Sequence, residues 1–213
     1  IKVNLEGYLK DFDQLVVINR NKILPSDSNY STEEGEAYGV DLTLKYEKPS
    51  WYIWTTYSLG YVTRFDGEQE YPTIFDRRHN VNLFGTYTFG EDNDWQFSLR
   101  WNFGSGFPFT KTQGFFTDIS FLEGVDTDYI TSNPDNVGII YSDERNGGRL
   151  PSYHRLDVSI QKNIQLSQKM NLEIVASATN AYNRDNIFYF DRVRFERVDQ
   201  LPIIPAIAVR FNY

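Results

Sequence analysis

The carboxylates of one polar segment, FLEGVDTDYITSNPDNVGIIYSDERNGG, are the side chains best suited to bind a metal. Asp126 and Asp128 supply oxygen ligands of the kind that Ca²⁺ prefers. The segment lacks the spaced glycine and the terminal glutamate of an EF-hand, and acidic loops are more often simply solvated. The two interpretations are therefore a structural calcium ion at this pair or a solvated loop, and the second is favoured. We predict no other cofactor.

The sequence offers no set of side chains for covalent catalysis. It contains no cysteine, and its two histidines are His79 and His154. Each histidine shares the parity of the apolar residues that follow it in an alternating segment, so both are expected on the apolar face. Because no histidine lies on the polar face to act as a base, we predict that the protein is not an enzyme. A membrane-embedded hydrolase ranks last among the alternatives.

Aromatic side chains are abundant, with 16 Phe, 15 Tyr and 4 Trp. Those in the long polar stretch between about residues 109 and 148 can stack on a ligand, since long loops are often functional. Packing of one loop against another is the equal alternative. The candidate ligand-binding residues are Phe115, Phe116, Phe121, Tyr129 and Tyr141.

Four arginines share the parity of the polar residues: Arg64, Arg100, Arg155 and Arg210. They can contact an anionic ligand or another part of the protein. They can also pair with Asp41, Asp157 or Glu173 on neighbouring strands, and this interpretation is favoured because opposite charges across strands stabilise a sheet. Arg77 has the opposite parity, so it is expected to face outward, toward lipopolysaccharide phosphates or solvent.

Apolar and polar residues alternate over eight segments that are expected to be strands. The segments are 1–17, 36–47, 51–64, 77–90, 95–106, 150–164, 171–182 and 205–213. Successive strand residues point to opposite faces, so each segment has one apolar and one polar face. Most segments exceed the five or six residues usual in soluble strands. They fit the length of about 9 to 11 residues that a tilted strand needs to cross a bilayer.

Short turns alternate with long loops along the chain, and aromatic residues such as Trp51, Tyr52, Trp54, Phe89 and Trp95 gather near the turns. Both features are typical of outer-membrane barrels with aromatic girdles. The fold class predicted is all-β, a transmembrane antiparallel β-barrel, and a soluble β-sandwich is the alternative. The net charge of −8 argues against a nucleic-acid partner.

Five stretches resemble the C-terminal barrel of TonB-dependent outer-membrane receptors, particularly those of Bacteroidetes-type bacteria. They are FDRRHNVNLFGTYTFG, FGSGFPFT, GRLPSYHRLDVSIQKNI, ATNAYNRDNIFYF and LPIIPAIAVRFNY. The resemblance implies a 22-stranded barrel filled by an N-terminal plug and energised through TonB. With about eight strands and no recognisable plug or TonB box, residues 1–213 are expected to be the C-terminal part of the barrel domain. The plug and the upstream strands would lie outside this chain.

The resemblance also implies a transporter that imports a scarce ligand, such as a metal chelate, a glycan, a peptide or a vitamin. Implied partners are outer-membrane lipid and lipopolysaccharide, the TonB complex through the missing N-terminal region, and a surface lipoprotein. A further partner is the barrel-assembly machinery, whose signal is similar to Ile207, Val209, Phe211 and Tyr213. The long loops are expected outside the bacterium and the C-terminus in the periplasm. The alternative is a complete eight-stranded barrel, an anchor or adhesin, in which the first strand pairs with the last.

Overall fold

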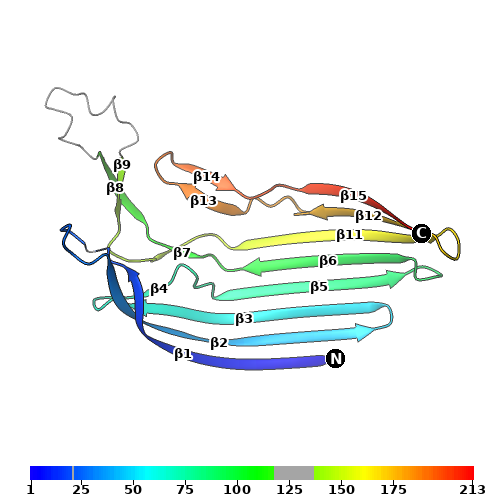
Figure 1. Ribbon diagram of the computed structural model, residues 1–213, viewed down its shortest axis with the longest axis horizontal. Helices are drawn as coiled ribbons and strands as arrows, with labels where there is room; N and C mark the ends of the chain where they lie inside the picture. The colour runs from blue at the N-terminus through cyan, green and yellow to red at the C-terminus, as the bar shows by residue number, and fades with distance from the viewer. Residues whose placement is uncertain (21, 118–136) are drawn as a thin grey trace, which may run out of the picture.

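Eight long strands form one antiparallel sheet in the order of the sequence (Figure 1). The structure is a computed structural model and describes residues 1–20, 22–117 and 137–213. The strands are β1 (Lys2–Ile18), β2 (Tyr30–Lys48), β3 (Trp51–Phe65), β5 (His79–Phe89), β6 (Trp95–Gly104), β11 (Tyr153–Gln165), β12 (Asn171–Thr179) and β15 (Ile204–Asn212). The all-β class and the eight strands are confirmed, although β2 begins at Tyr30 rather than Glu36.

The two ends of the sheet differ in their connections. Short turns join β2 to β3, β5 to β6 and β11 to β12 at one end, while long segments leave the other end (Figure 1). Asn171 pairs with Asn212, so the last residue lies at the short-turn end. The first strand also begins near this end, because Lys2 pairs with Lys45. We call the two ends the short-turn end and the loop end.

The strand register places the apolar residues of neighbouring strands on one face. One such row runs across six strands through Leu5, Leu42, Tyr57, Val81, Phe103 and His154. The next row lies on the opposite face and consists of Asn4, Thr43, Thr56, Asn82, Asn102 and Arg155. Asn102 donates a hydrogen bond of 2.5 Å to Asn82 within that row. The predicted apolar and polar faces are therefore continuous across the sheet.

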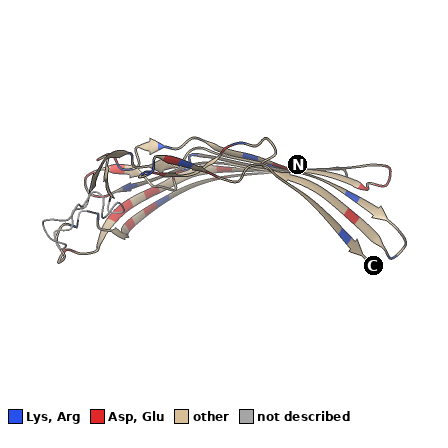
Figure 2. Cartoon of the chain, turned by 90° about the horizontal axis from the view of Figure 1, so that it is seen from above, with Lys and Arg blue, Asp and Glu red and all other residues tan. Residues whose placement is uncertain are grey.

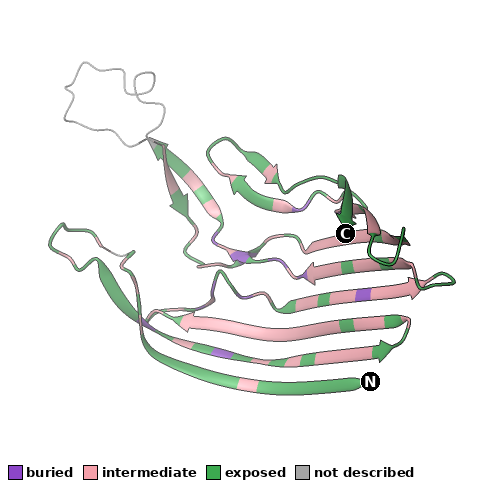
Figure 3. Cartoon of the chain, turned by 45° about the vertical axis from the view of Figure 1, so that its right-hand side comes forward, coloured by how far each residue is buried: buried purple, intermediate pink, exposed green. Residues whose placement is uncertain are grey.

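The sheet is a single layer, and no other element among the described residues covers its apolar face (Figure 3). The side chains of Leu5 and Ile207 are 68% and 79% exposed, whereas Ala37 and Tyr71 are the only hydrophobic residues that are buried among the described residues. The β-sandwich alternative is wrong, because it requires a second sheet across the apolar face. No helix in the described part of the chain is long and apolar enough to cross a membrane.

Both edges of the sheet are open. Strand β1 pairs only with β2, and β15 pairs only with β12, over residues that are all described. Seen from above, the sheet curves into an arch and does not close (Figure 2). The alternative of a complete eight-stranded barrel is contradicted, because it requires β1 to pair with β15.

Aromatic rings form a row on the apolar face at the short-turn end. Trp51 lies 4.3 Å from Tyr87 between ring centroids, Tyr87 lies 5.5 Å from Phe89, and Phe89 lies 6.0 Å from Trp95. Such a row matches the girdle predicted for this end. The prediction that Tyr52 and Trp54 belong to this girdle is wrong. They pair with Glu47 and Lys45 and lie on the polar face, because only alternate residues of a strand share a face.

A glycine and a tyrosine fit together on the polar face of the first three strands. The hydroxyl of Tyr8 lies 2.6 Å from the position that a Cβ atom at Gly39 would occupy, and 2.9 Å from the corresponding position at Gly60. Any larger residue at Gly39 would also meet the backbone oxygen of Leu59 at 2.4 Å. The ring of Tyr8 therefore occupies space that exists only because these two positions are glycines.

The two faces predict opposite tolerance to charge at adjacent positions. Leu99 lies in mid-strand on the apolar face, opposite Gly85 and Val158. We expect Leu99→Arg to reduce the free energy of folding into liposomes by about 2 to 4 kcal/mol. Ser98 lines a hollow of about 220 Å³ with Arg100 on the polar face, so Ser98→Arg should have a much smaller effect. Equal losses in denaturant titrations of the two variants would contradict the assignment of faces.

Candidate functional site

The loop end of the sheet carries short strands that the sequence did not reveal. Segments predicted as loops contain two hairpins, β8–β9 (Thr112–Thr117, Val137–Tyr141) and β13–β14 (Ile187–Asp191, Glu196–Asp199). Strands β7 (Pro108–Phe109) and β10 (Gly148–Arg149) pair at the base of the first hairpin, and β4 (Glu70–Pro72) pairs with β3. Figure 1 shows both hairpins at this end of the sheet.

An aromatic cleft lies between the two hairpins. It consists of two hollows of about 480 and 490 Å³ that share Thr112, Phe190 and Arg192. The other aromatic residues that line it are Phe109, Phe115, Phe188, Tyr189 and Phe195. We call these residues together the Arg192 cleft. Apolar walls with a few fixed polar groups are typical of small-molecule sites.

Arg192 joins the two hairpins at the centre of this cleft. Its Nη1 donates hydrogen bonds to the backbone oxygen of Thr110 at 2.7 Å and to Oγ1 of Thr112 at 2.9 Å. Its guanidinium also lies 5.1 Å from the ring of Tyr141. The remaining guanidinium donors have no hydrogen-bond partner within the described residues, so the cleft combines a fixed cation with aromatic surfaces.

Three of the five predicted loop aromatics can be placed. Phe115 lines the cleft and meets the ring of Phe195 at 5.3 Å, and Tyr141 lies beneath Arg192. Phe116 is 51% exposed and covers Gly138, which places it against its own hairpin. Phe121 and Tyr129 lie outside the described residues, as do the calcium candidates Asp126 and Asp128. Across the described ranges, no group of three or more His, Asp or Glu residues could hold a metal ion.

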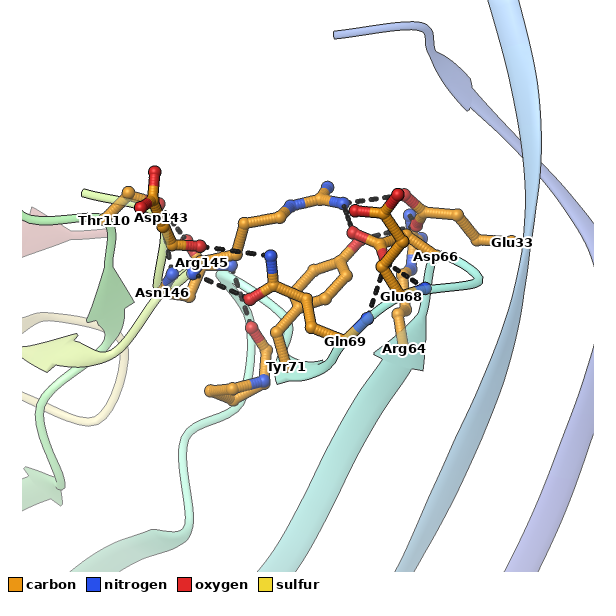
Figure 4. Close-up of polar contacts among 11 residues, drawn as sticks. Glu33, Arg64, Asp66, Glu68, Gln69, Tyr71, Thr110, Asp143, Arg145 and Asn146 are labelled. Carbon is orange, nitrogen blue, oxygen red and sulfur yellow. Dashed lines mark hydrogen bonds and ion pairs between the residues drawn. The ribbon is translucent and has the colours of Figure 1, made fainter. Parts of the chain in front are cut away.

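Arg145 connects the long loop to the ends of β2 and β3 (Figure 4). Its Nη1 lies 3.0 Å from Oε1 of Glu33 and 2.7 Å from Oδ2 of Asp66. Its guanidinium also stacks on the ring of Tyr71, 3.7 Å from the centroid. Burial opposes the charge of Arg145, but the hydrogen bonds to Asp66 and Glu33 outweigh burial and raise its pKa.

Tyr71 holds the buried carboxylate of this cluster. It is 4% exposed and donates a hydrogen bond of 2.5 Å to Oε2 of Glu33, which is 5% exposed. Burial and then this hydrogen bond raise the pKa of Tyr71 to about 12. Glu33 therefore receives a phenol and the cation of Arg145, with Arg64 at 3.7 Å, so its buried charge is compensated.

A second buried carboxylate fixes the segment before β5. Asp76 is 1% exposed, accepts a hydrogen bond from the backbone nitrogen of Val62 at 3.0 Å, and is paired with Arg149 and Arg78. Arg149 also donates to the backbone oxygen of Gly106 at 3.2 Å. These contacts tie the base of the β8–β9 hairpin to the wall of the sheet.

The four arginines predicted on the polar face have different partners. Arg210 pairs with Glu173 on the neighbouring strand at 3.4 Å, as the pairing interpretation predicts. Arg155 instead pairs with Asp157 on its own strand at 2.9 Å, and Arg64 pairs with Glu33 rather than Asp41. Arg100 lies opposite Asp157 in the register. Their roles toward a ligand stay predictions.

The structure corrects the orientation of Arg77. Its guanidinium occupies the space above Gly104, which lies on the polar face in the same strand as Arg100 and Asn102. The parity argument fails because β5 begins at His79 and Arg77 precedes it. His79 and His154 do lie on the apolar face, where each meets a tyrosine hydroxyl, that of Tyr57 at 2.9 Å and that of Tyr182 at 2.6 Å.

The sequence missed most residues of this site. Arg192 and Phe190 lie in a stretch that was assigned as a loop, although IFYFD and ERVD alternate weakly around it. Arg145 stood out as the single cation in an acidic stretch, but its partners Glu33 and Asp66 are 112 and 79 residues away in sequence. Spacing alone gives no signal for such contacts.

The described geometry agrees with comparisons to known proteins. The family model described as "TonB dependent receptor-like, beta-barrel" matches residues 1–183. The chain is similar to the ferripyoverdine receptor of the outer membrane of Pseudomonas aeruginosa bound to ferripyoverdine, with a TM-score of 0.67 and 10% identity. It is also similar to the FpvAI–pyocin S2 complex (TM-score 0.65, 10% identity) and to the copper transporter OprC (0.58, 11%).

These similarities cover 99% of this chain in each case, but 25%, 25% and 29% of the matched chains. The chain therefore spans about a quarter of the length of the solved structures that it matches. At such low identity the likeness concerns the fold alone. No curated protein matches the sequence.

Removing the Arg145 cation should release the long loop. Arg145→Met leaves the buried Glu33 with a more distant cation. We therefore expect the free energy needed to detach the loop from the sheet to fall by about 2 to 4 kcal/mol. Hydrogen exchange of the β8–β9 hairpin in the folded protein measures this loss. Lys111→Met is the matched control, because its contact with Glu144 is 4.0 Å long and exposed. Equal protection in both variants would contradict the role of Arg145.

Tyr71 gives the same cluster a pH dependence at high pH. Its pKa is raised from 10.0 to about 12, so the stabilisation from the protonated phenol is fully present below pH 10 and is lost as pH rises through about 12. Below pH 10, we expect the β8–β9 hairpin of the wild type to be better protected from hydrogen exchange than that of Tyr71→Phe, by an amount that does not vary with pH. Above pH 10 this difference in protection should shrink. The difference in phenolate absorbance between the two proteins locates the titration. A transition centred at pH 10 would contradict this environment.

Proposed function

Because this chain belongs to the TonB-dependent receptor-like β-barrel family, we propose that it forms part of a transporter that imports a scarce ligand across the outer membrane. The family is one of transporters without covalent chemistry, in agreement with the prediction that the protein is not an enzyme. The proposal rests on one observation, the single-layered sheet whose apolar face is exposed and whose polar face is continuous. Such a sheet suits a barrel wall between lipid and an aqueous interior.

The finer parts of the proposal follow from the resemblance of the sequence motifs. Residues 1–213 form the C-terminal part of a 22-stranded barrel domain, with the plug and the TonB contact outside this chain. The loop end is extracellular, and the short-turn end with the C-terminus is periplasmic. The Bacteroidetes-type relationship belongs to the same proposal. It is supported by motifs such as GRLPSYHRLDVSIQKNI.

The proposed partners follow from the two faces and the C-terminal strand. Lipid and lipopolysaccharide contact the apolar face, and a surface lipoprotein covers the loop end. The barrel-assembly machinery reads Ile207, Val209, Phe211 and Tyr213. These side chains lie in and just after β15 on one face, and Tyr213 is 97% exposed.

The Arg192 cleft is the proposed place of first ligand capture. Its aromatic surfaces and fixed cation suit a ligand with a flat or apolar part and an anionic group. A metal chelate, a glycan, a peptide and a vitamin all stay within the proposal. Ferripyoverdine and copper are ligands of the similar proteins, as their names state, and they define the first compounds to test.

Uptake by cells that carry or lack the gene tests the function. We expect deletion to abolish growth on one limiting nutrient from a panel of iron siderophores, copper, glycans, peptides and vitamin B12. Complementation should restore growth, and loss of TonB should abolish it again, because the inner membrane supplies the energy. If growth on every nutrient of the panel is independent of the gene and of TonB, the transport proposal fails for these ligand classes.

Two variants of one hairpin test the cleft in the same assay. Arg192→Gln removes the cation and its two hydrogen bonds, and it should reduce uptake at low ligand concentration about tenfold, as expected for the loss of one charged contact. Arg194→Gln is the matched control, because the side chain of Arg194 is 76% exposed and its one ion pair among the described residues is with Asp191 at 3.9 Å. Equal uptake by the two variants would place ligand capture elsewhere.

A further inference from the structure

Arg77 lies in a tight cradle on the polar face near the loop end. A Cβ atom at Gly104 would lie 2.5 Å from both Cζ and Nε of Arg77, so the side chain fits only because position 104 is a glycine. The guanidinium lies 4.1 Å from the ring centroid of Phe107 and 5.7 Å from that of Tyr153. Two separate parts of the chain, residues 104–107 and Tyr153, therefore hold this side chain in place.

The cation in this cradle has no carboxylate partner among the described residues. Its Nε is buried without a hydrogen-bond partner, and within the described residues no carboxylate lies within 4.0 Å of the guanidinium. The nearest acid in sequence, Asp76, is already paired with Arg78 and Arg149. Burial lowers the pKa of Arg77, and the smaller opposing effect comes from the phenol of Tyr153, not from a carboxylate.

Two other half-buried arginines at the loop end, Arg145 and Arg149, have carboxylate partners. Arg145 meets two carboxylates, and Arg149 meets one carboxylate and two backbone oxygens. A partly desolvated cation without such partners is destabilising, and buried polar groups in folded proteins are almost always satisfied. The guanidinium of Arg77, held in place and without a described carboxylate partner, is therefore suited to bind an anion.

We propose that Arg77 binds a carboxylate that reaches the polar face from outside the described sheet. A guanidinium stacked on Phe107 keeps its edge free, and that edge matches a carboxylate with two parallel hydrogen bonds. This inference rests on the proposed function, in which the polar face lines the transport path. The carboxylate comes either from a segment of the same protein inside the barrel or from a passing ligand.

Thermal unfolding of the purified full-length protein in detergent, with and without citrate as a tricarboxylate probe, tests the proposal. Arg77→Met keeps the apolar packing and removes the charge, and Arg77→Lys keeps the charge. If the carboxylate belongs to the protein, Arg77→Met lowers the Tm by about 2 to 4 °C and Arg77→Lys lowers it less. If it belongs to a ligand, citrate raises the Tm of the wild type and leaves that of Arg77→Met unchanged. Arg194→Met is the control for loss of an exposed charge.

Two results overturn the proposal. In the first, Arg77→Met is as stable as the wild type or more stable, and citrate shifts both proteins equally. In the second, Arg77→Lys is as unstable as Arg77→Met without a difference in their response to citrate, so only the shape of arginine matters. Because unfolding is measured without transport, these results stand whether or not uptake is found.

Discussion

The continuous apolar face is the constraint on which the rest of the structure depends. Eight strands keep one register, so that apolar rows such as Leu5, Leu42 and Tyr57 remain on the same side. A single layer has nothing of its own to cover this face, and water would oppose its exposure. Hydrocarbon removes the conflict, and the aromatic row from Trp51 to Trp95 fits the boundary where hydrocarbon meets water. The polar face is then free to carry function.

Buried charge at the loop end is the second determinant of the fold. In the part of the chain that the structure describes, the long connections contain one buried hydrophobic residue, Tyr71, so they have almost no hydrophobic core on which to pack. Glu33 and Asp76, with their arginine partners, take the place of such a core. Each pair links segments that lie far apart in sequence, and each is stable only while both members are present. The Arg192 cleft is held open in the same way, by hydrogen bonds from one hairpin to the base of the other.

Strand positions could be predicted from the sequence because alternation is a local signal. The eight segments and their two faces followed from a period of two. The predictions failed where the period stops. Arg77 precedes its strand, Tyr52 and Trp54 were grouped by nearness rather than parity, and the two hairpins have too few residues for a clear pattern. Contacts of Arg145 and Arg192 depend on tertiary structure, which no spacing encodes.

The alternation of apolar and polar residues does not distinguish strand registers that differ by two residues, but the position of Tyr8 does. Sliding β1 by one residue would exchange the two faces, which the apolar pattern forbids. Sliding it by two residues would leave every side chain on its proper face, so hydrophobicity alone cannot oppose that error. After such a slip, Tyr8 would lie over Ala37 or Asp41 instead of Gly39, and its ring would meet a Cβ atom where the native alignment has none. The contact between Tyr8 and Gly39 thus disfavours a two-residue slip of β1 against β2.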